Sequence, residues 1–234
     1  MKKSNLASLT VFFVLIPLTI FLGSKLPGRS YYLTSTAVIF EIMIPFFLGF
    51  EGRKPQAREL VVIAVLSALA VAARVAIPIP TFKAIFGVVM ISGIALGPEA
   101  GFLVGAIGAL GSNFFYGQGP YTPWQMLAYG AAGLIAGFAY QKGLLKRKPV
   151  PMAVFGFLGV LCFIGPLLDT CSLFIMAVEL NPASIAAIYA SGFPVNLSQS
   201  ICTALVMLLF AQPLLEKLDR VKQKFAIGEG EYGV

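Results

Sequence analysis

The chain has 234 residues, of which 58% are hydrophobic and only 12% charged, with a mean hydropathy of +0.88. A soluble domain has about a quarter of its residues charged, so this composition excludes a soluble globular protein and indicates an integral membrane protein. Histidine is absent and the net charge of +7 is spread between apolar segments, which excludes histidine-dependent catalysis and argues for membrane topology rather than nucleic-acid binding.

Apolar segments in chain order predict an all-α integral membrane protein, because a helix needs about 20 mostly apolar residues to cross a bilayer. The eight segments lie at 7–24, 32–50, 59–78, 83–98, 100–115, 123–141, 152–178 and 184–214. The first resembles the apolar region of a signal peptide, but no small-residue cleavage site follows it, so we expect it to be retained. The last two exceed one crossing, and Pro166 and Pro194 are predicted kink points within them.

The distribution of Lys and Arg predicts the orientation. Eight crossings place both termini on one side, and the basic residues concentrate in MKK, EGRKPQAR, QKGLLKRK and EKLDRVKQK on that side. We therefore expect cytoplasmic termini and a cytoplasmic tail over 216–234. The connections AIPIPTFK, SNFFYGQGPYTPWQ and VELNPAS would then face the outside.

Small residues repeat at steps of three or four in three segments, which brings their side chains onto one helix face. The third segment carries Ala64, Ala68, Ala72 and Ala76. Because small residues let helices approach closely in lipid, this alanine stripe predicts either an internal packing face or a docking surface for a separate membrane subunit. In the fifth and sixth segments we expect internal packing by Gly101, Gly105, Ala109, Gly130, Gly133 and Gly137.

Few ionisable side chains lie at membrane depth, where each is costly enough to suggest a function. Arg74 lies near the outer end of the third segment and Asp169 in the outer half of the seventh. They predict either parts of a site or a buried ion pair with each other, and Arg74 is also near enough to its segment end to snorkel. Glu41 in the second segment has no evident partner, and its role stays open.

Polar and aromatic side chains gather at the outer ends of the later segments. They are Asn113, Tyr116, Gln118, Tyr121, Trp124, Gln125, Tyr129, Asn196, Ser198 and Gln199. Trp and Tyr alone are typical of an interfacial belt, but lipid-facing amides would leave their hydrogen bonds unmade. Together with Arg74 and Asp169, this set predicts a small-molecule pocket on the outer side. Whether Trp124 faces that pocket or the lipid headgroups stays open.

Sequence motifs of catalysis and ATP hydrolysis are missing. There is no GxxxxGK[ST], no HExxH and no serine nucleophile elbow. We therefore expect a binding protein that is not an enzyme and needs no cofactor or metal. The competing hypothesis is a membrane-embedded lipid-modifying enzyme or accessory factor, for which the cytoplasmic side offers only Glu51, Glu59 and Glu99 outside the charged tail.

Three stretches together suggest a family: the alanine stripe, ALGPEAGFLVGAIGALGSNFF and GQGPYTPWQMLAYGAAGLIAG. They resemble the substrate-specific S components of energy-coupling factor (ECF) transporters, which take up vitamins across the prokaryotic cell membrane. The resemblance covers roughly 58–215 and implies a six-helix core, to which 1–57 adds two N-terminal transmembrane helices.

The resemblance also implies a mechanism and partners. The chain would bind a vitamin outside with high affinity, under the AIPIPTFK loop, and deliver it by toppling against a transmembrane coupling subunit driven by two ATPase subunits. The alanine stripe would dock the coupling subunit. The two extra N-terminal helices resemble the subset associated with cobalamin or precursors such as dimethylbenzimidazole, which is the first substrate hypothesis; riboflavin and pantothenate are the alternatives.

Overall fold

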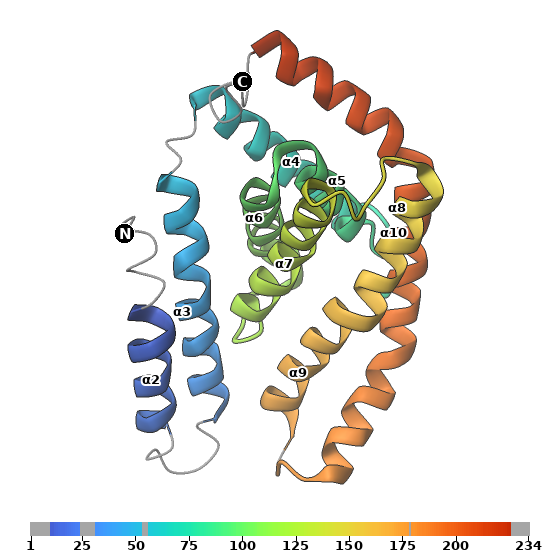
Figure 1. Ribbon diagram of the computed structural model, residues 1–234. Helices are drawn as coiled ribbons and strands as arrows, with labels where there is room; N and C mark the ends of the chain where they lie inside the picture. The colour runs from blue at the N-terminus through green and yellow to red at the C-terminus, as the bar shows by residue number, and fades with distance from the viewer. Residues whose placement is uncertain (1–9, 24–30, 53–55, 178, 226–234) are drawn as a thin grey trace.

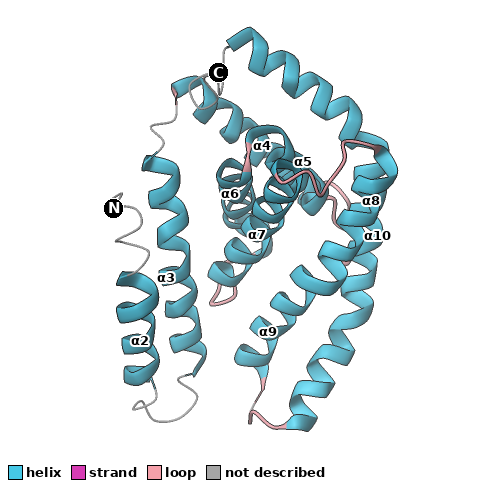
Figure 2. Ribbon diagram, in the orientation of Figure 1, coloured by secondary structure: helices cyan, strands magenta, loops and turns pink. Residues whose placement is uncertain are grey.

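The computed structural model describes residues 10–23, 31–52, 56–177 and 179–225, and within these ranges all regular structure is helical (Figure 2). The helices, shown in Figure 1, are η1 (Val11–Leu15), α2 (Ile16–Gly23), α3 (Tyr31–Gly52), α4 (Ala57–Val75), α5 (Ile85–Leu96), α6 (Pro98–Tyr116), α7 (Thr122–Gln141), α8 (Pro149–Gly159), η2 (Val160–Ile164), α9 (Gly165–Met176) and α10 (Pro182–Phe225).

Within the described residues, each predicted segment coincides with helical structure, but length and apolarity identify fewer membrane spans. In the described part of the chain, Pro149–Met176 and Pro182–Phe225 are long and apolar enough to cross a membrane. The first of these joins α8, the π-helical turn η2 and α9 into one run. By contrast, α5 has 12 residues, which extend about 18 Å at 1.5 Å per residue, short of a hydrocarbon core of about 30 Å. The number of crossings therefore stays a prediction.

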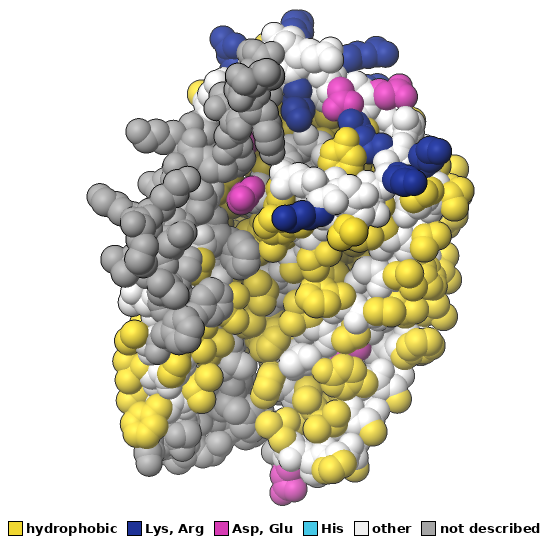
Figure 3. Space-filling model, in the orientation of Figure 1, with side chains coloured by type: hydrophobic (Ala, Val, Ile, Leu, Met, Phe, Trp, Pro, Cys, Tyr) yellow, Lys and Arg dark blue, Asp and Glu magenta, His cyan; other side chains and the backbone are white. Residues whose placement is uncertain are grey.

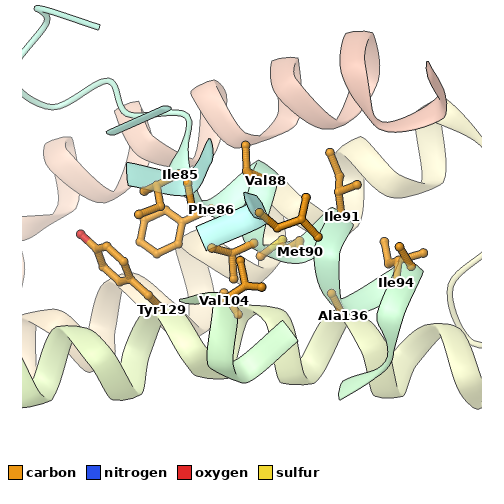
Figure 4. Close-up of a cluster of buried hydrophobic side chains, with 14 of the residues drawn as sticks. Ile85, Phe86, Val88, Met90, Ile91, Ile94, Val104, Tyr129 and Ala136 are labelled. Carbon is orange, nitrogen blue, oxygen red and sulfur yellow. The ribbon is translucent and has the colours of Figure 1, made fainter. Parts of the chain in front are cut away.

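The centre of the bundle is α5, whose residues from Ile85 to Ala95 are all buried. Its apolar side chains pack against α4, α6, α7, α8 and α10. Figure 4 shows Phe86 and Met90 of α5 beside Val104 of α6 and Tyr129 of α7. A helix that is apolar on every side is typical of a fully buried position, and this one fixes the spacing of its neighbours.

The predicted close packing of glycines is confirmed between α5, α6 and α7. A Cβ atom on Gly133 would lie 2.3 Å from the Gly101 carbonyl oxygen, and one on Gly105 would lie 2.2 Å from the Tyr129 carbonyl oxygen. Backbones therefore touch directly where α6 crosses α7, the approach that small residues permit in membrane helices. This contact sets the position of the α6–α7 connection.

The C-terminal part of α10 turns across one end of the bundle (Figure 1). The predicted tail, 216–234, begins inside this helix, which continues to Phe225; residues 226–234 lie outside the described residues. Leu215 and Leu218 are buried, and Lys222 Nζ donates a hydrogen bond to the Ala95 carbonyl at 2.8 Å. Residues 216–225 are therefore packed onto the end of α5.

The N-terminal helix α3 packs against α6, α7 and α9. Ile39 and Met43 are buried in these contacts, and the Thr36 hydroxyl donates to the Pro120 carbonyl at 3.3 Å. On α3, Glu41 accepts a hydrogen bond from the Thr19 hydroxyl of α2, and its other carboxylate oxygen is buried without a partner. Glu41 therefore joins the two N-terminal helices to each other.

Charge and apolar surface are separated along the molecule (Figure 3). Lys and Arg gather toward one end, while much of the remaining surface is apolar and includes exposed Phe163, Leu209 and Phe210. Large exposed apolar side chains of this kind suit a lipid environment.

Candidate functional site

A cavity of about 290 Å³ lies where the C-terminal ends of α4 and α6 meet the N-terminal ends of α5 and α7, beside the middle of α10. It is lined by Arg74, Pro80, Lys83, Asn113, Tyr116, Tyr121, Gln125, Tyr129 and Gln199. The basic segments EGRKPQAR and QKGLLKRK adjoin the opposite ends of α4 and α7. The cavity thus lies at the end of the bundle away from them, the end predicted to face outward.

Arg74, in the last turn of α4, is the central charge of the site. It is only 9% exposed, and its guanidinium donates to Ser112 Oγ at 2.6 Å and to Asn113 Oδ1 at 2.8 Å. The ring centres of Tyr116 and Tyr129 lie 5.0 and 5.2 Å from the Cζ atom of Arg74, close enough for cation–π attraction. The arginine is therefore held in place by neutral groups and does not snorkel away from the protein.

Asn113, fully buried on α6, connects Arg74 to the start of α7. Its Oδ1 accepts from Arg74, and its amide donates to Gln125 Oε1 at 2.7 Å and to Thr122 Oγ1 at 3.2 Å. Because Asn is both acceptor and donor, it satisfies groups on two helices at once. It fixes the orientation of Arg74 and Gln125 in the cavity wall.

Lys83 enters the site from the loop between α4 and α5. Its ammonium donates to the Ile77 carbonyl at 2.6 Å and lies 5.4 Å from the centre of the Tyr116 ring. The same loop is tied to α10 by a hydrogen bond of 3.1 Å between Thr81 Oγ1 and Ser198 Oγ. The loop thus brings a second buried cation, 9% exposed, to the cavity.

The tyrosines and Gln199 supply the remaining wall. Tyr129 packs edge-on against Phe86 at 4.7 Å, and its hydroxyl points away from the apolar cluster (Figure 4). Tyr116 and Tyr121 donate to the Arg74 and Gly117 carbonyls. Gln199 Oε1 is buried without a hydrogen-bond partner. The site therefore keeps one unsatisfied acceptor, which a donor group of a ligand would satisfy.

Seven of the eleven predicted site residues line the cavity: Arg74, Asn113, Tyr116, Tyr121, Gln125, Tyr129 and Gln199. Gln118 does not; it is exposed, and it accepts a hydrogen bond from Thr122 at 2.9 Å. Sequence reasoning did not select Pro80 and Lys83, although the AIPIPTFK loop that contains them was expected to cover the site. A lysine in a loop rich in proline was the available signal.

Trp124 lies outside the cavity lining. Its side chain faces neither the cavity nor the lipid headgroups, which were the two alternatives considered from the sequence. It is 5% exposed and packs with Ile39 of α3 and Cys171 of α9, and its ring centre lies 5.8 Å from that of Phe174. Its indole N–H has no hydrogen-bond partner. The tryptophan thus fills the space between α3, α7 and α9.

Asp169 and Asn196 form a separate polar contact between α9 and α10. Asn196 Nδ2 donates to Asp169 Oδ2 at 2.7 Å, and a Cβ on Gly192 would lie 2.1 Å from Asp169 Oδ1. The alternative of an Arg74–Asp169 ion pair is wrong, because each of the two side chains bonds to other groups. Neither Asp169 nor Asn196 lines the cavity.

The alanine stripe lies on the exposed side of α4. Ala64, Ala68, Ala72 and Ala76 are all exposed, whereas Ile63, Leu66 and Ala70 on the other side are buried. Internal packing, the first alternative for this stripe, is therefore wrong within the described chain. The surface is open to lipid or to another subunit.

Comparison with known protein families matches the chain to a transporter family. The family model described as ECF-type riboflavin transporter, S component, matches residues 54–216, more than half of the chain. No match was found among curated proteins or among solved structures.

Proposed function

We propose that this chain, which belongs to the family of ECF-type riboflavin transporter S components, captures a vitamin in the cavity between α4, α5, α6, α7 and α10. Membership makes the chain a substrate-binding subunit of a prokaryotic plasma-membrane transporter rather than an enzyme, and implies association with ECF transmembrane and ATPase subunits. The lipid-modifying enzyme considered from the sequence is therefore set aside.

The observation that carries this proposal is the construction of the cavity. Two buried cations, three amides and three tyrosine rings converge on it from α4, α6, α7, α10 and the loop between α4 and α5. Aromatic walls with a few oriented polar groups are how small-molecule sites are built. The buried, unpaired Gln199 Oε1 in its wall is placed to accept a hydrogen bond from a donor group of a ligand.

The substrate is a compact vitamin. The cavity of about 290 Å³ lies at the lower end of the range for drug-sized ligands, about 300–1,000 Å³, and intact cobalamin is larger than such ligands. The matching family's description names riboflavin, whose planar ring suits stacking on tyrosine. Riboflavin and pantothenate therefore replace cobalamin as the leading candidates.

Thermal denaturation of the purified chain with a panel of vitamins tests the capture function. A ligand at about 100 times its Kd adds about 2.7 kcal/mol to the free energy of unfolding. We expect one compact vitamin to raise Tm, with no ATP hydrolysis by the chain alone. A panel without any stabilising vitamin, or robust ATPase activity, would contradict the proposal.

The exposed alanine stripe docks the transmembrane coupling subunit, because small side chains let a second helix approach closely. We expect Ala68→Trp and Ala72→Trp to leave vitamin binding intact and to abolish copurification with the coupling subunit. The matched control is Leu209→Trp, at a residue 60% exposed on α10. Normal assembly of both alanine variants would assign the stripe to lipid contact alone.

A further inference from the structure

Two positive charges border the cavity, and its lining contains no negative one. Arg74 and Lys83 are each 9% exposed, and none of the nine lining residues is Asp or Glu. Their hydrogen-bond acceptors are neutral: a hydroxyl, an amide and a backbone carbonyl. Both cations also lie near one ring, at 5.0 and 5.4 Å from the centre of Tyr116.

Three carboxylates elsewhere in the described chain are bonded to other groups. Asp169 is bonded to Asn196 between α9 and α10, outside the lining. Asp219 pairs with Arg147 at 2.7 Å, among the basic segments at the other end of the bundle. Glu41 is bonded to Thr19 on the N-terminal helices. The two charges at the cavity therefore have no acidic partner among these groups.

The helix dipoles compensate the charge only in part. The N-terminal ends of α5 and α7 and the C-terminal ends of α4 and α6 all meet at the cavity. The N-terminal ends carry positive partial charges and the C-terminal ends carry negative ones, so their effects at the cavity oppose one another. The side-chain cations are then the main source of the local field, and buried charges without a counter-charge are costly.

We infer that the ligand supplies the missing negative charge: the cavity takes a vitamin that bears a carboxylate or a phosphate, with the anionic oxygens directed at Arg74 and Lys83. This inference rests on the proposed function and narrows it to a class of substrate. Arg74, held by Ser112 and Asn113, presents a fixed guanidinium to the anion, while Lys83 on the loop adds a second charge-assisted hydrogen bond. Gln199 Oε1 accepts from a donor elsewhere on the ligand.

Two pairs of compounds that differ at the anionic group test the inference on the full-length protein. The pairs are riboflavin with riboflavin 5′-phosphate, and pantothenol with pantothenate, in which an alcohol is replaced by a carboxylate. Isothermal titration should show an anionic member binding at least about tenfold more tightly than its neutral partner. The riboflavin pair tests for a phosphate and the pantothenol pair tests for a carboxylate, so the comparison shows which anionic group the cavity binds.

The variants Lys83→Gln and Lys83→Arg test whether Lys83 recognises the negative charge of the ligand. We expect Lys83→Gln to weaken the anionic ligand at least about tenfold more than its neutral partner, and Lys83→Arg to retain the preference. The control is Lys142→Gln, at an exposed lysine in the basic segment after α7. It removes one positive charge from the protein without changing the cavity.

Several results would overturn the inference. Equal or tighter binding of the neutral member in both pairs would do so, and so would an equal loss for both members in Lys83→Gln. The comparison within the pairs uses the wild-type protein, so it decides the matter even if that variant does not fold. Binding confined to neutral vitamins would contradict this inference alone, whereas no binding of any vitamin would contradict the proposed function.

Discussion

At the scale of single residues, the site depends on one buried amide. Asn113 bonds to Arg74, Gln125 and Thr122, which come from α4 and α7. Replacing it with an apolar residue removes a bond that Arg74 donates and the bonds that Gln125 Oε1 and Thr122 Oγ1 accept, and a buried group left unpaired costs about 1–3 kcal/mol. Asn113 is thus expected to govern both the affinity and the local order of the cavity.

Asn113→Leu should therefore lower vitamin affinity by at least about tenfold and reduce Tm. Titration calorimetry and thermal denaturation measure the two effects. Gln118→Ala is the control, because Gln118 is an exposed amide outside the cavity lining. Equal effects of the two substitutions would show that Asn113 has no special place in the site.

Substitution of Trp124, unlike that of Asn113, should have little effect on vitamin affinity. Because its indole N–H is unpaired and its ring packs on Phe174 away from the cavity, Trp124→Phe should keep the vitamin Kd within about twofold, less than 0.5 kcal/mol. Direct titration measures the change. A large loss of affinity would place Trp124 in the binding site after all.

At the scale of helices, the contact of α6 with α7 holds the two walls of the cavity together. Gly133→Ala would bring a methyl group to 2.3 Å from the Gly101 carbonyl oxygen. Overpacking of this kind costs about 1–3 kcal/mol, so Tm should fall and vitamin affinity should weaken as the helices separate.

The matched control is Gly159→Ala, where the added methyl would lie 3.5 Å from Met90 Cε, an ordinary contact. Since Ala is favoured over Gly in a helix by about 1 kcal/mol, this variant should be at least as stable as the wild type. Similar Tm changes in the two variants would contradict the role assigned to the Gly133 contact.

The helices and their close contacts followed from the sequence because apolar runs and small-residue spacing are local patterns. The alanine stripe and the pair Gly101 and Gly105 of α6 have the same four-residue spacing, yet the stripe is exposed and the two glycines are buried. Spacing does not reveal which way a helix is rotated. Likewise, Asp169 shares its predicted depth with Arg74 but lies between α9 and α10, a placement that only the packing of whole helices determines.

At the scale of the whole molecule, the cavity and the basic segments lie at opposite ends of α4 and α7. The positive-inside rule predicts cytoplasmic basic segments, and this orientation would make the cavity open outward. A membrane-impermeant maleimide should label Ile79→Cys, 53% exposed, in intact cells, and Leu144→Cys, 82% exposed, only after permeabilisation. A Cys162→Ala background removes the exposed native thiol. The reverse pattern would invert the topology.

The N-terminal helices have a defined place in this arrangement. Helix α3 packs on α6, α7 and α9, while the alanine stripe of α4 stays exposed. The additional helices thus support the flank of the core and leave the proposed docking surface accessible.

The most direct test of the central claim is an experimental structure of the protein bound to the vitamin that stabilises it. The account predicts ligand density in the cavity of about 290 Å³, in contact with Arg74 and Lys83 and within hydrogen-bond distance of Gln199. Density for the vitamin between α9 and α10 beside Asp169, or at the basic end of the bundle, would contradict it.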